Sequence, residues 1–365
     1  MKVLHIITRM NTGGPAVFLD HLTKSMADLG TKSVIAYGYC ESNETDYTDT
    51  HKLNADLIRV QSLHRSLNPV SDIKSFFQIR KIIKTQKPDI VNTHTSKAGA
   101  LGRLAAKSVN KKTPVVHTFH GHLIYGYFAK YKSFIFTLIE RSLARLTNAA
   151  VCITSETQSS LLKSKIGRKL TWKVIRLGIP LGETTISPIK ESERIQLLWV
   201  GRFTDIKDPF YAVSVLSELE SIAPNKYQLK MIGGGELLDK SKQAASNLPI
   251  TFTGWVDAPF ETSGYFDLLL LTSKNEGMGL VMLEAARLRK ATVGKNVGGV
   301  GEFLVNDVNG LIIDGQPEDM AREINKLAID DIQRLGNAAY EELAKNFSDK
   351  RLAKEYFDLY QSLSV

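Results

Sequence analysis

The sequence predicts an α/β fold made of two doubly wound domains. Short apolar runs with the character of buried strands alternate with amphipathic helical stretches along both halves, which is the pattern of consecutive βαβ units. The pattern is interrupted at residues 181–194, where Pro, Gly, Ser, Thr and charged residues indicate a linker. A chain of 365 residues with 43% apolar content is long enough to give each domain a core of its own.

The first domain is expected at residues 1–180. Helical spacing is clearest between residues 15 and 30, where Phe18, Leu22 and Met26 recur every four positions and Gly30 follows. Further helices are predicted at residues 76–87, 98–109 and 134–147. Six apolar runs predict the strands: residues 3–8, 33–39, 89–95, 114–120, 149–155 and 172–178.

The second domain is expected at residues 195–348, because the apolar pattern begins again at residue 195. Its predicted strands are residues 195–201, 227–233, 250–255, 267–273, 291–295 and 310–314. The last residues of the chain have the spacing of an amphipathic helix.

The net charge of +9 is unevenly divided. Residues 1–190 carry 28 Lys and Arg against 12 Asp and Glu, a balance of +16, whereas the remainder carries 19 against 26, a balance of −7. This asymmetry indicates an anionic partner for the first half. No helix-turn-helix, zinc-finger, RNP or KH pattern supports nucleic acid as that partner.

Cysteine usage and hydropathy predict a cytoplasmic protein, either soluble or peripheral to a membrane. Cys40 and Cys152 lie in separate strand-like contexts, and two cysteines do not make a disulfide framework. The six-residue apolar stretch before Arg9 is too short for a signal peptide. No run approaches the roughly 18 apolar residues needed to cross a bilayer.

The most informative stretch is SKNEGMGLVMLEAA, residues 273–286, which follows a buried strand. On one continuous helix, Glu276 and Glu284 would lie about 80° apart around the axis. If Glu276 instead lies in a glycine turn before the helix, both carboxylates can line one crevice at the carboxyl edge of the sheet. The alternative is a pair of solvated surface carboxylates.

This stretch resembles the E-x7-E motif of the retaining family 4 glycosyltransferases, which have the GT-B fold, two Rossmann-like domains facing a central cleft. Five other stretches resemble signatures of that family, in order, and extend the resemblance over nearly the whole chain: NTGGP (11–15), HTFHGH (117–122), GRFTDIK (201–207), MIGGGE (231–236) and TGWV (253–256). The resemblance implies an acceptor-side first domain, a second domain that binds a nucleotide-sugar, and a final helix, residues 349–365, that crosses back to the first domain.

The resemblance also implies which residues hold the sugar and the nucleoside. Glu276 would hold hydroxyls of the transferred sugar and Glu284 those of the ribose, as acidic residues do in other Rossmann units. The remaining donor contacts would come from the backbone of residues in glycine turns and beside them: Gly234, Trp255, Val256, Gly277, Met278, Gly279 and Leu280. Met278 stands where the family often has an aromatic residue.

A nucleoside diphosphate leaves readily only when its charge is neutralised. The sequence contains no D-x-D triplet, so Arg202 and Lys207, at the end of a strand, are predicted to supply fixed cations without a metal ion. The resemblance adds the backbone N–H of Gly14. Asp208 departs from the family pattern, which often has glycine there.

The histidines of HTFHGH suggest zinc, but no cysteine or carboxylate lies close enough in sequence to complete a site, so no metal is predicted. His117 reads as a packing residue. By resemblance, His120 faces the donor sugar and His122 faces the acceptor.

Together these observations predict a retaining, metal-independent glycosyltransferase without a cofactor, in which Glu276, Arg202, Lys207 and His120 carry the reaction. A UDP-sugar is favoured as the donor. The resemblance implies a role in bacterial surface polysaccharide synthesis, such as O-antigen, lipopolysaccharide or capsule. Aromatic and basic residues interleaved over 123–145 suggest an anionic membrane surface and a lipid-linked acceptor. The alternatives are a nucleotide-sugar epimerase of the same fold and a non-catalytic anion-binding or nucleic-acid-binding protein.

Overall fold

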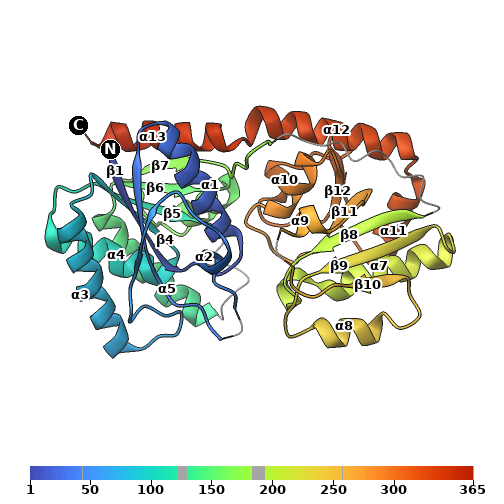
Figure 1. Ribbon diagram of the computed structural model, residues 1–365, viewed down its shortest axis with the longest axis horizontal. Helices are drawn as coiled ribbons and strands as arrows, with labels where there is room; N and C mark the ends of the chain where they lie inside the picture. Colours follow the sequence, from blue (N-terminus) through green and yellow to red (C-terminus); the bar gives the residue numbers. More distant parts are fainter. Residues whose placement is uncertain (43, 122–129, 183–193, 257, 365) are drawn as a thin grey trace. The chain divides into compact units, whose positions relative to one another are not determined.

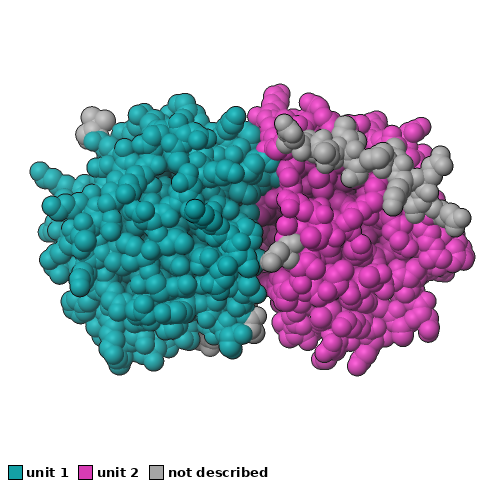
Figure 2. Space-filling view, viewed as in Figure 1, with its two compact units in different colours: residues 1–180, 348–365 teal, residues 181–347 magenta. Residues whose placement is uncertain are grey.

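The protein forms two compact units, which Figure 2 colours separately. The computed structural model describes residues 1–42, 44–121, 130–182, 194–256 and 258–364. Unit 1 consists of Met1–Pro180 together with Ser348–Val365, and unit 2 of Leu181–Phe347. Most of the predicted linker, residues 183–193, lies outside the described residues.

Unit 1 is built on a parallel sheet with the strand order β3-β2-β1-β4-β5-β6-β7. The strands are β1 (Lys2–Arg9), β2 (Lys32–Gly38), β3 (Asp56–Arg59), β4 (Ile90–His94), β5 (Val115–Phe119), β6 (Ala149–Cys152) and β7 (Thr171–Val174). All six predicted strands are present. The sequence did not predict β3, because this short edge strand is half polar and largely exposed and so lacks an apolar run.

The order of the strands reverses between β1 and β4. In open sheets of this kind, ligands bind beyond the carboxyl ends of the two strands at the reversal. The helices of unit 1 are α1 (Gly14–Asp28), α2 (Tyr47–Thr50), α3 (Pro69–Gln86), α4 (Ser96–Val109), α5 (Lys130–Leu143), α6 (Ser155–Lys163), α13 (Asp349–Leu363) and the 3₁₀ turn η1 (Ala144–Leu146). Figure 1 labels all of them except α6 and η1.

Helix α3 begins seven residues before the predicted start at residue 76. The apolar side chains of its first turns, Val70 and Ile73, are exposed and stand between polar residues, so this stretch did not show the apolar spacing that the prediction used. Asn68 caps the helix by accepting a hydrogen bond from the backbone N–H of Ser71, and Pro69 occupies the first position, where its missing N–H costs nothing.

Buried polar contacts join α4 to α5, and α13 to the sheet, in unit 1. Arg103 of α4 and Glu140 of α5 form a bidentate ion pair, at 2.8 and 2.9 Å, with almost no solvent exposure. Helix α13 is held to the sheet by two tyrosine hydroxyls: Asn92 of β4 donates to Tyr360 at 2.7 Å, and Tyr356 lies 3.1 Å from the hydroxyl of Thr118 of β5. These contacts make the end of the chain part of unit 1.

Unit 2 repeats the architecture with the strand order β10-β9-β8-β11-β12-β13, again all parallel. The strands are β8 (Ile195–Val200), β9 (Tyr227–Ile232), β10 (Ile250–Phe252), β11 (Leu268–Leu271), β12 (Ala291–Gly294) and β13 (Gly310–Ile312). These are the six strands that the sequence predicted.

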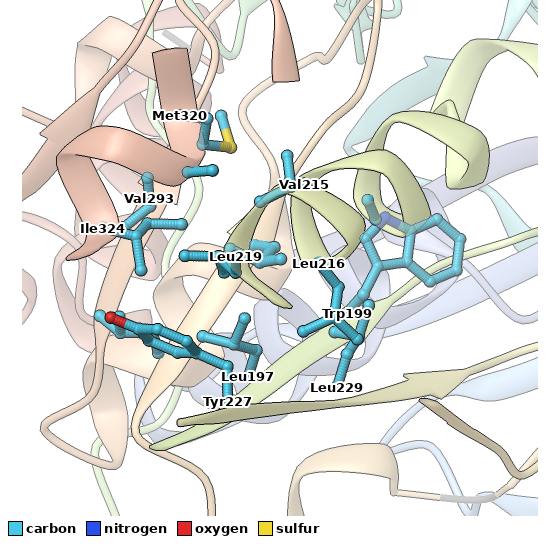
Figure 3. Close-up of a cluster of buried hydrophobic side chains, with 14 of the residues drawn as sticks. Leu197, Trp199, Val215, Leu216, Leu219, Tyr227, Leu229, Val293, Met320 and Ile324 are labelled. Atoms are coloured by element: carbon cyan, nitrogen blue, oxygen red, sulfur yellow. The ribbon is translucent and has the colours of Figure 1, made fainter. Parts of the chain in front are cut away.

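The helices of unit 2 are α7 (Pro209–Ile222), α8 (Leu238–Ala244), α9 (Pro259–Thr262), α10 (Leu280–Arg287), α11 (Pro317–Lys326) and α12 (Ile329–Asn346), with the 3₁₀ turns η2 (Asp205–Lys207) and η3 (Val300–Glu302). Figure 3 shows side chains of β8, α7 and α11, among them Trp199, Leu216 and Ile324, meeting in the core between the helices and the sheet. This core holds β8 in position against the helices, and the loop that carries Arg202 and Lys207 leaves the carboxyl end of β8.

Candidate functional site

The strand order of unit 2 reverses between β8 and β11, so the loops that leave these two strands lie at the position where open sheets bind ligands. Residues 201–208 follow β8, and residues 272–279 follow β11. Arg202, Lys207 and Glu276 therefore come to the same edge of one sheet, although up to 74 positions separate them in the sequence.

A buried threonine joins the two loops. Thr272 accepts a hydrogen bond from the indole Nε1 of Trp199 at 2.9 Å, and its own hydroxyl lies 3.1 and 3.0 Å from the carbonyl oxygens of Lys207 and Asp208. The backbone N–H of Lys274 also donates to the carbonyl of Ile206 at 2.8 Å. The loop carrying Lys207 is thereby fixed to the loop carrying Glu276.

The ammonium group of Lys207 forms an ion pair with Oε1 of Glu276, and the hydroxyl of Ser273 donates to the same oxygen at 2.7 Å. Glu276 is only 8% exposed. The alternative of a solvated loop carboxylate is therefore wrong. The other oxygen, Oε2, has no hydrogen-bond partner among the residues that the structure describes, and it is free to accept from a ligand.

A second loop presses on the backbone of Glu276. The N–H of Gly299 donates to the Glu276 carbonyl at 3.2 Å, and a Cβ on Gly298, whose φ is +55°, would lie 1.9 Å from that oxygen. Only glycine fits this close approach. Neither Gly298 nor the supporting hydroxyls of Thr272 and Ser273 were predicted from the sequence, because single Gly, Thr and Ser residues have no distinctive spacing.

Glu284 lies on α10, whereas Glu276 lies in the turn before that helix. Burial raises the pKa of Glu284, and the neighbouring Arg287, whose Nε lies 3.2 Å from Oε2, opposes this shift. Gly279, with φ +74°, is the N-cap of α10, Met278 is buried, and Leu280 is the first residue of the helix. The turn that contains Gly277 thus leads directly into the start of the helix.

The departure from the family pattern at Asp208 has a structural explanation. Asp208 adopts the left-handed conformation, with φ +49°, and its carboxylate caps α7 by accepting from the N–H of Tyr211. Glycine suits this conformation best, but aspartate tolerates it and adds the cap. Arg202, six residues earlier, is exposed and has no side-chain partner among the described residues.

The indole ring of Trp255 packs against the glycine turn that follows β9. A Cβ on Gly234 would lie 2.3 Å from Nε1 of Trp255, so Gly234 makes room for that side chain. Trp255 itself is 53% exposed, and Val256 packs into the core beneath it. The carbonyl of Gly234 also accepts from the N–H of Phe203, which joins this turn to the loop after β8.

Unit 1 places Gly14 at the first position of α1, after β1. Space around Gly14 is open, since a Cβ there would meet no atom within 4 Å. His120, also in unit 1, follows β5 and is half-buried, while His122 lies outside the described residues.

His120 belongs to a chain of three imidazoles. Nδ1 of His5, in β1, lies 3.2 Å from Nε2 of His94, at the end of β4, and Nδ1 of His94 lies 2.9 Å from Nε2 of His120. Burial lowers the pKa of His5 to about 3 and that of His120 to about 4. Burial, followed by the neighbouring histidines, also holds the pKa of His94 well below 6.5. His5 and His94 were not among the predicted site residues, because they lie inside apolar strands far from the HTFHGH motif.

Thr95, directly after His94, has φ +59°, which is unusual for a β-branched residue. Its hydroxyl lies 2.7 Å from that of Thr8 and accepts from the Thr8 N–H, while Thr8 accepts from the N–H of Ala98. These bonds hold the strained turn at the reversal of strand order in unit 1.

Within the described part of the chain, no group of three or more His, Cys, Asp and Glu side chains is arranged to hold a metal ion. Both cysteines are free.

Comparison with known proteins identifies the two units. Residues 12–182 match the family described as Glycosyltransferase Family 4, and residues 184–347 match Glycosyl transferases group 1. An Escherichia coli protein named UDP-Gal:alpha-D-GlcNAc-diphosphoundecaprenol alpha-1,3-galactosyltransferase is 28% identical over 74% of this chain and 73% of its own length. The E. coli O-antigen biosynthesis glycosyltransferase WbnH is 27% identical, over 80% of this chain and 81% of its own.

Solved structures confirm the predicted GT-B fold. Anabaena HepE, determined with UDP and glucose, aligns with a TM-score of 0.81 at 17% identity, covering 99% of this chain and all of its own. Sucrose-phosphate synthase from Thermosynechococcus elongatus aligns with a TM-score of 0.82 at 16% identity, covering 100% and 99%.

The neutral histidines make stability depend on pH. Because the folded-state pKa values of His5, His94 and His120 lie below 6.5, the unfolded chain binds protons that the folded chain does not as the pH falls through 6.5. Stability is therefore fully present well above pH 6.5 and should fall by about 1.4 kcal/mol per histidine between pH 7.5 and pH 5.5. Urea unfolding at pH 7.5 and 5.5 measures this loss. His5→Gln should lose less over the same interval, and an equal loss in the variant would contradict the assignment.

Proposed function

The chain belongs to the glycosyltransferases that join a family 4 domain to a group 1 domain, and from that premise we propose that it moves a sugar from a UDP-sugar, with retention of configuration and without a metal ion, to a hydroxyl of a lipid-linked saccharide. The setting is bacterial surface polysaccharide biosynthesis, since the relatives include proteins named for O-antigen, capsule and lipopolysaccharide core synthesis. UDP is favoured because HepE was determined with UDP-glucose and the E. coli galactosyltransferase is named for UDP-Gal.

The single observation that carries the proposal is the geometry around Glu276. Lys207 and Ser273 hold one carboxylate oxygen in place, the other is available, and the pair lies where the sheet of unit 2 reverses its strand order. A fixed, ionised acceptor at this edge suits the hydroxyls of a sugar.

The diphosphate is proposed to lie against Arg202 and Lys207. Arg202 offers a planar guanidinium for bidentate contact with phosphate oxygens. Lys207 keeps N–H donors beyond the one that it directs to Glu276, so one ammonium can join the sugar-binding carboxylate to the leaving phosphate. These fixed cations support metal-independent departure of the nucleotide, assisted by the N–H of Gly14 and the first amides of α10.

The nucleoside is proposed to lie along the next turns of unit 2. Glu284 takes the ribose hydroxyls, for which its largely buried carboxylate is suited when a ligand hydroxyl donates to it. The exposed indole of Trp255, lying over Gly234, offers a surface to the base in addition to the main chain of Trp255 and Val256.

Retention follows if the acceptor attacks from the face that the phosphate leaves. The bond from the anomeric carbon to the phosphate oxygen breaks, the bond to the acceptor oxygen forms on the same face, and the departing phosphate takes the proton of the acceptor hydroxyl. The protein then chiefly orients the reactants and stabilises developing charge. His120 is proposed to form a hydrogen bond with a sugar hydroxyl.

The acceptor is proposed to be reached at an anionic membrane surface. Four apolar side chains of α5 are exposed: Phe134, Ile135, Leu138 and Ile139. Helix α3 exposes Val70, Ile73 and Phe77 among several lysines, and it packs beside α4, which in turn contacts α5 (Figure 1). Apolar faces among basic side chains suit the headgroup level of an anionic leaflet.

Two findings bear on the acceptor. The E. coli relative is named for a diphosphoundecaprenol acceptor, which is a lipid-linked saccharide. Among the helices that the structure describes, none has the length and hydropathy to cross a membrane. Residues 122–129, part of the interleaved aromatic segment, lie outside the described residues.

Glu276→Gln, Lys207→Met and Arg202→Met should each lower turnover about 10²-fold to 10³-fold, the cost of losing one fixed transition-state contact. Transfer from a panel of UDP-sugars to undecaprenyl-diphosphate saccharides measures this. The matched control is Asp205→Asn, because Asp205 forms an exposed ion pair with Lys274 across the same two loops and should be dispensable. Undiminished turnover in the first three variants would remove the site assignment, and conversion of the donor without acceptor would favour an epimerase.

Activity should survive EDTA, since Arg202 and Lys207 meet the charge of the leaving group. Rates are compared before and after chelation and again with added Mg²⁺ or Mn²⁺. Loss of activity with EDTA and recovery with either cation would contradict metal independence.

Binding to vesicles should require anionic lipid and weaken with salt. Replacing Phe134 and Ile135 of α5 with serine should reduce cosedimentation, as should Lys130→Glu with Lys132→Glu. The control is Ile222→Ser, which removes an exposed apolar side chain of unit 2. Equal binding of the α5 variants and wild type, or no binding of wild type at low salt, would refute the membrane surface.

A further inference from the structure

The three imidazoles of unit 1 form a continuous hydrogen-bonded chain across three neighbouring strands. His5 lies in β1, His94 at the end of β4, and His120 just beyond β5, and β4 pairs with both β1 and β5. The chain therefore crosses the reversal of strand order in unit 1. We propose that His5 and His94 are positioning residues that fix the tautomer of His120, so that its Nδ1 carries the proton and donates to an oxygen of the donor sugar.

The two N···N contacts leave only Nδ1 of His120 for a ligand. Nε2 of His120 is in contact with Nδ1 of His94. Nδ1 of His120 has no hydrogen-bond partner among the described residues, and it is not one of the fully buried atoms without a partner, so it is open to a ligand. The His120 ring is held by Phe18, whose edge-on contact has a centroid distance of 4.9 Å, and the planes of the hydrogen-bonded His5 and His94 rings are only 27° apart. The orientation of the His120 ring is therefore set by Phe18 on one side and by the contact with His94 on the other.

The direction of the chain follows from counting protons. Each neutral imidazole has one N–H and one bare nitrogen, and each N···N contact needs one proton. Three rings and two contacts leave one N–H over, and it lies at one end of the chain. Either all three rings are protonated on Nε2, which leaves the N–H at His5, or all three are protonated on Nδ1, which leaves it at His120.

The surroundings of His5 favour the second arrangement. His5 is fully buried, and its Nε2 has no hydrogen-bond partner among the described residues. A buried N–H without an acceptor is rarer in proteins than a buried acceptor without a donor. We therefore assign the unprotonated nitrogen to Nε2 of His5, which is buried. Nδ1 of His120, at the open end, then carries the proton.

The arrangement has a chemical consequence. A neutral Nδ1–H is a donor only, so it can bind a hydroxyl oxygen of the sugar without accepting its proton. Because burial keeps all three imidazoles neutral, they add no positive charge beside an oxocarbenium-like transition state. The identity of the ligand rests on the proposed function, whereas the tautomer does not.

The tautomer can be measured on the full chain without substrate. Protein labelled with ¹⁵N-histidine gives long-range ¹H–¹⁵N correlations in which protonated and bare ring nitrogens have distinct shifts. The eight histidines are assigned with single His→Gln variants. At pH 7.5, His5, His94 and His120 should each be protonated on Nδ1. Protonation of His120 on Nε2 overturns the proposal.

Variants of His94 test whether the contacts among the three imidazoles fix the Nδ1–H tautomer of His120. His94→Leu removes both contacts and should release His120 into a mixture of tautomers, whereas His94→Gln retains one donor and one acceptor and should preserve the Nδ1–H signal. The matched control is His117→Leu, a buried strand histidine that bonds to Thr93 and lies outside the chain. An unchanged His120 spectrum in His94→Leu, or the same change in His117→Leu, overturns the positioning role.

Kinetics provide a second readout. His94→Leu should lower kcat roughly 10-fold, and His94→Gln should recover most of it. KM for the UDP-sugar should change less than about twofold, because the nucleotide contacts are unaffected. A fall in both variants alike overturns the positioning role. If His94→Leu does not fold, the spectra of wild type and His94→Gln decide whether the positioning role holds.

A protein inactive on every UDP-sugar but showing the expected tautomers would refute the proposed function and leave the tautomer assignment intact.

Discussion

The reversal of strand order is the constraint on which both candidate sites depend. In a parallel sheet every strand presents its carboxyl end at one edge, and only at the reversal do the two outgoing loops diverge and leave a crevice between them. In unit 2 this occurs between β8 and β11, where Thr272 joins the two loops. In unit 1 it occurs between β1 and β4, where Thr8 and Thr95 perform the same task. The core in Figure 3 supports this arrangement by holding β8 against its helices.

Once the loops are fixed, the two sites satisfy their buried polar groups in different ways. Unit 2 pairs charges, since a carboxylate as buried as Glu276 is stable only with a partner such as Lys207. Unit 1 removes charge, since burial keeps its histidines neutral and hydrogen bonds between rings satisfy them. Some polar atoms stay without partners among the described residues, including Nε2 of His5. Such local costs are typical of functional sites, where geometry is maintained at the expense of stability.

The sequence predicted what depends on local pattern. Twelve strands were identifiable because each is a short apolar run bounded by turn residues, and β3 was not, because an exposed edge strand needs no such run. The glycines at 277 and 279 made a turn position for Glu276 one of the alternatives, and the structure selects it by starting α10 at Leu280. Contacts between distant segments were not predictable. His5 and His94 are 89 positions apart, and nothing in either strand marks them as partners. The space beside Gly234 is filled by Trp255, which the glycine motif alone does not reveal.

The difference between the units agrees with the charge changes of glycosyl transfer. Negative charge grows on the departing diphosphate, and positive charge grows at the anomeric carbon. Cationic groups are useful beside the first and harmful beside the second. In the mechanism that we propose, Arg202 and Lys207 of unit 2 supply the cations, and Glu276, which forms an ion pair with Lys207, provides a compensating negative charge. Burial lowers the pKa of His120 in unit 1 to about 4, so near neutral pH the N–H that we propose it donates to the sugar brings no positive charge. In this proposal, the burial that lowers the pKa of His120 and the exposure that leaves the Arg202 guanidinium open to phosphate serve the same chemistry.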